Sequence, residues 1–129
     1  TGVAEVVQLL DGGALAVSDI DSVIGGSAST DELTLLSAGS VAISAIDTVT
    51  GSTGADTLAL LVGGTVEVSA IESVIGSAGS DDALVLSEAA ADVRVSGVET
   101  VTGQSGGTDT ELCWCMNTVF EQARSQAPP

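Results

Sequence analysis

The sequence VAISAIDTVTG, residues 41–51, decides how this chain folds, because variants of it return at a regular interval. Successive copies place their serine 26, 25 and 27 residues apart. A repeat of this length is one supersecondary unit that cannot bury its own apolar face, so neighbouring units must stack. The four copies are LAVSDIDSVIG (15–25), VAISAIDTVTG (41–51), VEVSAIESVIG (66–76) and VRVSGVETVTG (93–103). The sequence therefore predicts a solenoid.

The composition is apolar and strongly acidic at the same time. Apolar residues make up 44% of the chain and aromatic residues only 2%, so the core must consist of small aliphatic side chains, which suit thin parallel strands. The net charge is −16, with eighteen acidic residues, two arginines, no lysine and no histidine. Phosphate contacts need cations, which excludes nucleic acids and anionic membrane surfaces as partners. No apolar run approaches the roughly 18 residues of a membrane span.

Each repeat unit contains three short stretches in which apolar residues recur at close spacing. Alternation with a period of two predicts strands that turn one face inward. In the third unit these stretches are Leu58-x-Leu60, Val66-x-Val68 and Ile71-x-x-Val74. Three strands per unit predict an all-β fold, a right-handed parallel β-helix with three strands in each coil of about 25 residues. We expect residues 1–107 to form about four such coils, starting partway through a unit.

The segment after the last unit has a different pattern and predicts a helix. Thr108 and Glu111 have the spacing of a capping box, and apolar residues follow at helical spacing. We expect residues 108–126 to form an amphipathic helix that caps the last coil, with 127–129 as a tail. Cys113 and Cys115 would point apart on this helix, which favours buried free thiols over an intrachain disulfide. A disulfide or a shared metal between copies is the alternative.

Stacked coils would align equivalent residues in columns about 4.8 Å apart. Neighbouring carboxylates at that distance repel by roughly 1 kcal/mol in water, so an acidic column must be screened by solvent or bridged by cations. A serine column is expected to satisfy backbone groups in the turns, because no histidine or lysine is present to activate a hydroxyl. The acidic column contains Asp21, Asp47, Glu72 and Glu99, and the serine column Ser18, Ser44, Ser69 and Ser96.

The turns GSTGADTLAL (51–60) and GSAGSDDALVL (76–86) resemble the nonapeptide of hemolysin-type (RTX) calcium-binding repeats, G-G-x-G-x-D-x-U-x, where U is aliphatic. This resemblance implies Ca²⁺ held by turn carbonyls and the aspartate. The matching residues are Gly51, Gly54, Asp56, Gly76, Gly79 and Asp81, with Asp31 and Asp109 one residue out of place in weaker copies. An RTX β-roll carries two nonapeptides per coil. One per unit is more similar to longer three-strand repeats of large secreted or surface-layer-like bacterial proteins. Alternatively, glycine and aspartate simply form tight turns.

Three functions follow from these patterns. The first is a structural, self-associating module of an extracellular or cell-surface assembly, such as a fibre, surface layer, adhesin stalk or virion appendage, with Ca²⁺ as a candidate stabiliser. The second is a calcium-binding folding module of a secreted RTX-like protein. The third, a polysaccharide-acting enzyme, would use acid pairs such as Asp19 and Asp21, or Asp81 and Asp82. Because the units lack aromatic residues for sugar stacking, we do not expect the protein to be an enzyme. We expect it to form a homo-oligomer or to be part of a larger protein assembly.

Overall fold

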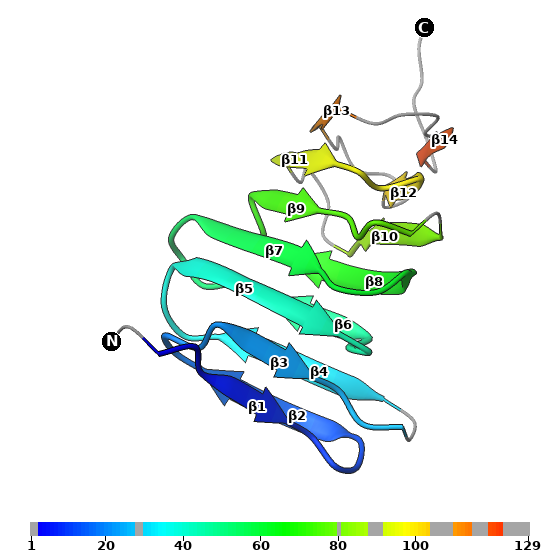
Figure 1. The fold of residues 1–129 in the computed structure, drawn as a ribbon. Helices are drawn as coiled ribbons and strands as arrows, with labels where there is room; N and C mark the ends of the chain where they lie inside the picture. The colour runs from blue at the N-terminus through cyan, green and yellow to red at the C-terminus, as the bar shows by residue number, and fades with distance from the viewer. Residues whose placement is uncertain are drawn as a thin grey trace, which may run out of the picture.

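The computed structural model is a parallel β-solenoid, with about five turns over residues 6–86 (Figure 1). It describes residues 3–27, 30–79, 81–87 and 92–103, and the strand assignments of residues 110–114 and 119–122. All strand pairs within this part of the chain are parallel. In the same part there is no helix with the length and apolar character that crossing a membrane requires.

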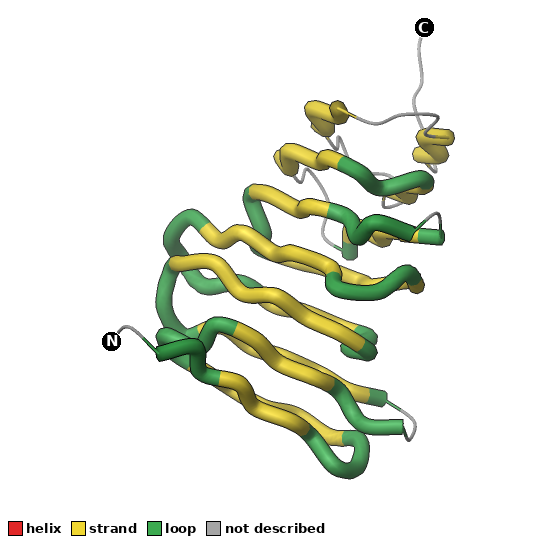
Figure 2. Tube along the Cα trace, in the orientation of Figure 1, coloured by secondary structure: helices red, strands yellow, loops and turns green. Residues whose placement is uncertain are grey.

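The strands alternate between two sheets as the chain advances, which Figure 2 shows as yellow segments joined by green loops at both edges. We call them the odd sheet and the even sheet after the strand numbers. The odd sheet contains β1 (Val6–Gln8), β3 (Ser22–Ile24), β5 (Gly39–Ser44), β7 (Asp56–Leu60), β9 (Ser73–Ile75), β11 (Asp92–Ser96) and β13 (Thr110–Trp114). The even sheet contains β2 (Gly13–Val17), β4 (Asp31–Leu35), β6 (Thr48–Thr50), β8 (Gly64–Ser69), β10 (Asp82–Leu86), β12 (Thr100–Gly103) and β14 (Val119–Gln122).

The prediction of three strands in a coil of about 25 residues was wrong. Leu58 pairs with Val41 on one side and with Val74 on the other, so one turn of the solenoid takes 17 or 16 residues here and contains two strands. A repeat of three strands therefore spans one and a half turns. Side chains of valine, leucine and isoleucine fill the roughly 10 Å between two packed sheets, so the core needs no third wall.

Because a repeat spans one and a half turns, equivalent residues of successive repeats lie in opposite sheets. Val23 and Val74 belong to the odd sheet, whereas Val49 and Val101 belong to the even sheet. All four point into the core and are completely buried. A structural environment therefore recurs on the same sheet only after two repeats, or three turns.

The core is one continuous apolar layer between the two sheets. The inward residues of the strands alternate with exposed or half-buried ones, as the sequence predicted. Leu33, Leu58 and Leu84 occupy equivalent places and are at most 1% exposed. In the first coil, Leu9 and Leu15 pack against this layer but are only partly buried, because no further coil covers them in the structure.

The helix predicted for residues 108–126 is not confirmed. The described residues of this segment form β13 and β14, which extend the odd and the even sheet. The remaining residues of the segment, Cys115 among them, lie outside the described residues, as does the tail 127–129.

Candidate functional site

The corner that follows each serine of the repeated phrase has a left-handed backbone. The φ angles of Asp19, Ala45 and Ala70 are 58°, 57° and 54°, and Gly97 has 70° in the fourth repeat. A residue with a Cβ pays roughly 1–2 kcal/mol for this conformation, and only glycine adopts it freely. This single residue ends one strand and directs the chain toward the opposite sheet.

The glycine that closes each phrase is required by a close backbone contact between adjacent turns. A Cβ at Gly25, Gly51 or Gly76 would lie 1.8 Å from the carbonyl oxygen of the left-handed residue on the next turn. The amide of Gly51 donates to the carbonyl of Ser69 at 2.9 Å, which holds the two turns together. The last glycine of the phrase therefore allows the close approach of the left-handed corner on the adjacent turn, and the two residues are needed together.

The Gly-rich turns close around a buried aspartate at the start of the following strand. Asp31, Asp56 and Asp82 are 1%, 0% and 1% exposed. The Oδ2 atom of Asp56 accepts hydrogen bonds from the amide of Ser52 at 2.6 Å and from its hydroxyl at 2.9 Å. Asp82 accepts the same pair from Ser77, at 2.8 and 2.9 Å. The aspartate thus replaces the hydrogen bonds that the turn amides would make with water.

The acidic residue of each phrase makes a reciprocal pair of hydrogen bonds with the turn below, which we call the carboxylate clamp. The amide of Asp47 donates to the carbonyl of Asp31 at 3.0 Å, and the amide of Asp31 donates back to Oδ2 of Asp47 at 2.9 Å. The same clamp joins Glu72 to Asp56, Glu99 to Asp82 and Asp21 to Glu5. The clamp carboxylates therefore hold the backbone of adjacent turns in register.

The clamp carboxylates do not form the single column that the sequence predicted. Asp21 and Glu72 lie at the edge where the chain passes from the even to the odd sheet, whereas Asp47 and Glu99 lie at the opposite edge. Residues of one edge are three turns apart, or about 14 Å at the usual strand spacing. This exceeds the Debye length of about 8 Å, so the predicted repulsion does not arise.

The serines divide between the two sheets in the same way. Ser44 and Ser96 end strands of the odd sheet, Ser69 ends β8 of the even sheet, and Ser18 follows β2. The Ser18 hydroxyl donates to Oδ2 of Asp19 and lies 3.2 Å from the Ser37 hydroxyl. Both contacts of Ser18 are with side chains and not with the turn backbone that the sequence predicted, and the serines form two rows in place of one.

The structure brings the predicted metal residues into the turns but assigns the aspartates differently. Gly54 and Gly79 donate their amides to the hydroxyls of Ser52 and Ser77. Asp82 takes the buried position, and Asp81, which the match to the nonapeptide selected, is exposed. The signal that identifies the buried residue is its distance from the next core leucine, as in Asp82-x-Leu84. Asp109 lies outside the described residues.

The contacts of the buried aspartates do not fit a calcium ion. Ca²⁺ requires six to eight oxygen ligands, but the groups that hydrogen-bond to the Asp56 and Asp82 carboxylates are N–H and O–H donors. Among residues 3–27, 30–79, 81–87 and 92–103, no three Asp, Glu, Cys or His side chains gather into a metal-binding group. The prediction of calcium in these turns is not confirmed, and the contacts favour a structural role for the aspartates.

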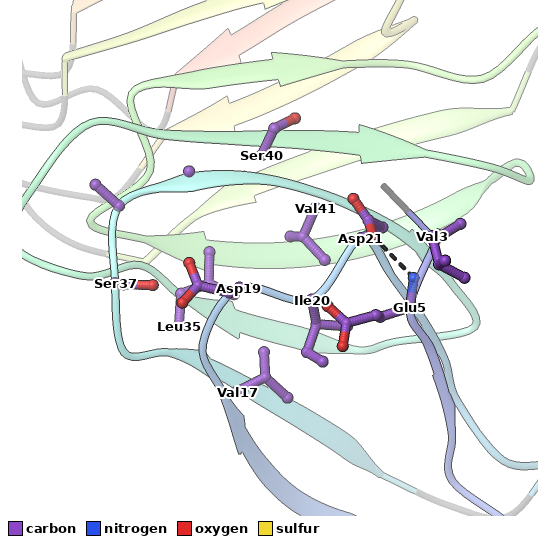
Figure 3. A pocket seen from close by; sticks show the side chains of 13 residues that line it. Val3, Glu5, Val17, Asp19, Ile20, Asp21, Leu35, Ser37, Ser40 and Val41 are labelled. Carbon is purple, nitrogen blue, oxygen red and sulfur yellow. Dashed lines mark hydrogen bonds between the residues drawn. The ribbon is translucent and has the colours of Figure 1, made fainter. Parts of the chain in front are cut away.

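Two grooves lie at the edges of the solenoid, each between a left-handed corner and the loop one turn above it. The larger, of about 710 Å³, has Val17, Leu35 and Val41 on its floor and Glu5 and Asp21 at its mouth (Figure 3). The smaller, of about 300 Å³, is lined by repeat-equivalent residues, with Asp31 and Asp47 in the places of the two acids. The grooves lie at opposite edges because one repeat rotates the chain by half a turn.

Comparison with known proteins gave no match to a family model, a curated protein or a solved structure. The resemblance to RTX repeats is therefore not confirmed.

Proposed function

We propose that this chain is a structural β-solenoid segment that associates end to end with a second copy of itself. The observation that carries the proposal is the parallel backbone pairing of coil on coil, and the coil at the blue end of Figure 1 shows the strand edges that a coil of a second copy would use. Its two strands, β1 and β2, each pair on one side only, with β3 and β4. The other side of each strand presents backbone groups that a further strand would pair.

The side chains of this coil support the same association. Strand edges are usually protected by charges or proline, but the sequences of β1 and β2, VVQ and GALAV, contain neither. Leu9 and Leu15 are only partly buried, and the larger groove opens directly onto the core at Val17. Covering these residues removes apolar surface from water, which stabilises an end-on contact.

The calcium-binding folding module remains the alternative proposed from the sequence. It would require the turn amides and hydroxyls around Asp56 to give way to carbonyl ligands. Its test is independent of self-association, because calcium dependence is measured on the folded monomer.

End-on association is tested by sedimentation velocity over a wide range of protein concentrations. Gly13 and Val17 of β2 bond toward β4, so the amide of Ala16 faces the open side of the strand, since alternate residues of a parallel strand bond in opposite directions. Ala16→Pro removes that amide, and Ala16→Ser retains it as a matched control. We expect concentration-dependent oligomers of the parent chain and of Ala16→Ser, and weaker association of Ala16→Pro. A strictly monomeric parent chain would overturn the proposal.

A further inference from the structure

One aspartate of the chain is followed directly by glycine, namely Asp11, and it lies with Gly12 in the loop between β1 and β2. Both residues are exposed. The loop is held at its two ends, where the amides of Leu9 and Gly13 donate to carbonyls of the next turn at 2.8 and 2.9 Å. Between these two bonds, the amide of Gly12 donates to no acceptor in the part of the chain that the structure describes.

A carboxyl group and the amide nitrogen of the following residue are the two reactants of an intramolecular ring closure. The nitrogen of Gly12 bonds to Cγ of Asp11, and water leaves, formed from the carboxyl OH and the amide hydrogen. Water then opens the ring. Opening at Cγ restores aspartate, whereas opening at the main-chain carbonyl carbon gives isoaspartate, in which the backbone continues through the side chain. Glycine favours ring closure because no Cβ stands beside its nitrogen and its backbone rotates easily.

Two other exposed aspartates are followed by an amide that is already hydrogen-bonded. The amide of Ser22, which follows Asp21, donates to a carbonyl of the adjacent turn at 3.1 Å. The amide of Asp82, which follows Asp81, donates to a clamp carboxylate at 2.8 Å. An amide held in this way must first break its hydrogen bond before its nitrogen can reach a neighbouring carboxyl group.

The remaining described aspartates are protected by their neighbours or by burial. The exposed Asp19 and Asp47 precede Ile20 and Thr48, whose branched side chains crowd the nitrogen that would attack. The buried aspartates, of which Asp56 is an example, are held by hydrogen bonds to their own turns. Asp11 therefore differs from all of them in combining exposure, an unbonded amide and a following glycine.

We propose that Asp11 is a site of isoaspartate formation in the folded protein. The reaction needs only water, and it leaves the net charge of the chain unchanged. Ser37 and Val62 stand in the place of Asp11 in the equivalent loops after β4 and β7, so the modification is restricted to one of the three loops.

The modification inserts one carbon atom into the main chain at a crowded contact between turns. A Cβ at Gly26 would lie 3.1 Å from the carbonyl carbon of Asp11 and 3.2 Å from its nitrogen, so the two loops are already close. Gly26 also donates its amide to Oδ2 of the buried Asp31 at 3.0 Å. Isoaspartate at residue 11 therefore displaces the turn that encloses Asp31, and it should lower the melting temperature.

The test is incubation of the full, folded chain in heavy-oxygen water at neutral pH, followed by digestion and mass spectrometry. Each ring opening adds one heavy oxygen atom whichever product forms, and electron-transfer fragmentation identifies isoaspartate. A protein concentration at which the chain is monomeric separates this reaction from end-on association. We expect heavy oxygen and isoaspartate at Asp11, and neither at Asp21 or Asp81.

The same incubation in urea isolates the effect of the fold. Unfolding breaks the hydrogen bonds of the Ser22 and Asp82 amides, so Asp21 and Asp81 should acquire label in urea, whereas Asp11 should be labelled in both states. The absence of label at Asp11 in the folded chain, or equal labelling of Asp21 there, would overturn the proposal.

Two variants test the roles of the reacting residues. Gly12→Ala should lose most of the label at Asp11, and the fold accepts alanine there because Ala38 occupies the equivalent place. Its control, Gly63→Ala, makes the same change in the loop after β7 and should leave the labelling of Asp11 unchanged. Equal labelling in these two variants would exclude Gly12 as the attacking residue.

The effect on stability is tested with Asp11→Ser, which copies Ser37 of the equivalent loop and removes the reacting carboxyl group. During a long incubation the melting temperature of the parent chain should fall, whereas that of Asp11→Ser should stay constant. An equal fall in both chains would show that isoaspartate at residue 11 is not the cause.

Discussion

Asp56 and Glu72 exchange two hydrogen bonds across adjacent turns, although 16 residues separate them. The amide of Asp56 donates to Oε2 of Glu72 at 2.8 Å, and the amide of Glu72 donates to the carbonyl of Asp56 at 3.2 Å. One end of this clamp is completely buried, since Asp56 is 0% exposed, and the other reaches solvent through the exposed Glu72. A surface carboxylate thus satisfies a backbone amide that water cannot reach.

Replacing Glu72 by alanine should lower the free energy of unfolding by about 1–3 kcal/mol, because the amide of Asp56 then loses its acceptor. Urea unfolding followed by circular dichroism measures the loss. Glu67→Ala is the matched control, because Glu67 is exposed on the outer face of β8 and belongs to no clamp. Equal losses of unfolding free energy in the two variants would show that the hydrogen bonds of the clamp add nothing to the effect of removing one negative charge.

Gly51→Ala should be among the most destabilising single substitutions in the chain. The added Cβ would lie 1.8 Å from the carbonyl oxygen of Ala70, so adjacent turns would have to separate, at a cost of about 3 kcal/mol. Thermal unfolding gives the comparison with Gly79→Ala, whose Cβ would meet only the Ser77 hydroxyl at 3.3 Å. A Gly51→Ala chain as stable as the Gly79→Ala chain would contradict the described contact between turns.

Ala70→Gly should stabilise the fold. Ala70 has a φ angle of 54°, and the fourth repeat already has glycine at this corner. Relief of the left-handed strain exceeds the added entropy of the unfolded chain, so we expect a gain of about 0.5–1 kcal/mol. Ala59→Gly, in the extended strand β7, should destabilise instead. A loss of stability in Ala70→Gly, measured by the same thermal melts, would contradict the assignment of strain to this corner.

Calcium should not stabilise the fold more than magnesium does at equal ionic strength. The carboxylates of Asp56 and Asp82 already accept hydrogen bonds from turn donors, and these donors would repel a cation. The measurement is the melting temperature of the chain with Ca²⁺, with Mg²⁺ and with a chelator, which we expect to be the same with the two cations. A rise in the melting temperature that is specific to Ca²⁺, and lost in Asp56→Asn, would restore the calcium-binding alternative.

The sequence was sufficient to predict the strands of the repeat units and their inward residues, since alternation such as Leu58-x-Leu60 depends only on the pleat, but not β13 and β14. It could not predict how far the chain rotates at each corner. Three strands per repeat fit a complete three-sided coil and one and a half two-sided coils equally well. The number of strands in each coil depends on the left-handed corner at residues such as Ala45. The φ angle of such a residue cannot be predicted from the pattern of apolar residues.

The candidate site was less accessible to sequence analysis for the same reason. Counting from the glycines selected Asp81, but the strand fixes the buried residue, and a longer turn shifts that residue to Asp82. The groove at Asp31 contains residues from three successive turns, which can be identified only when the number of residues per turn is known. The crowding of Gly26 by Asp11 is likewise a contact between turns.

The half-turn rotation from one repeat to the next gives the molecule two chemically separable sides. A partner that approaches one edge meets every second repeat, and the repeats between them face a different partner. Substitutions confined to alternate repeats would therefore alter the specificity of one side while the other keeps its own, with the core unchanged. A single tandem sequence can in this way present one set of side chains at one edge of the solenoid and a different set at the other.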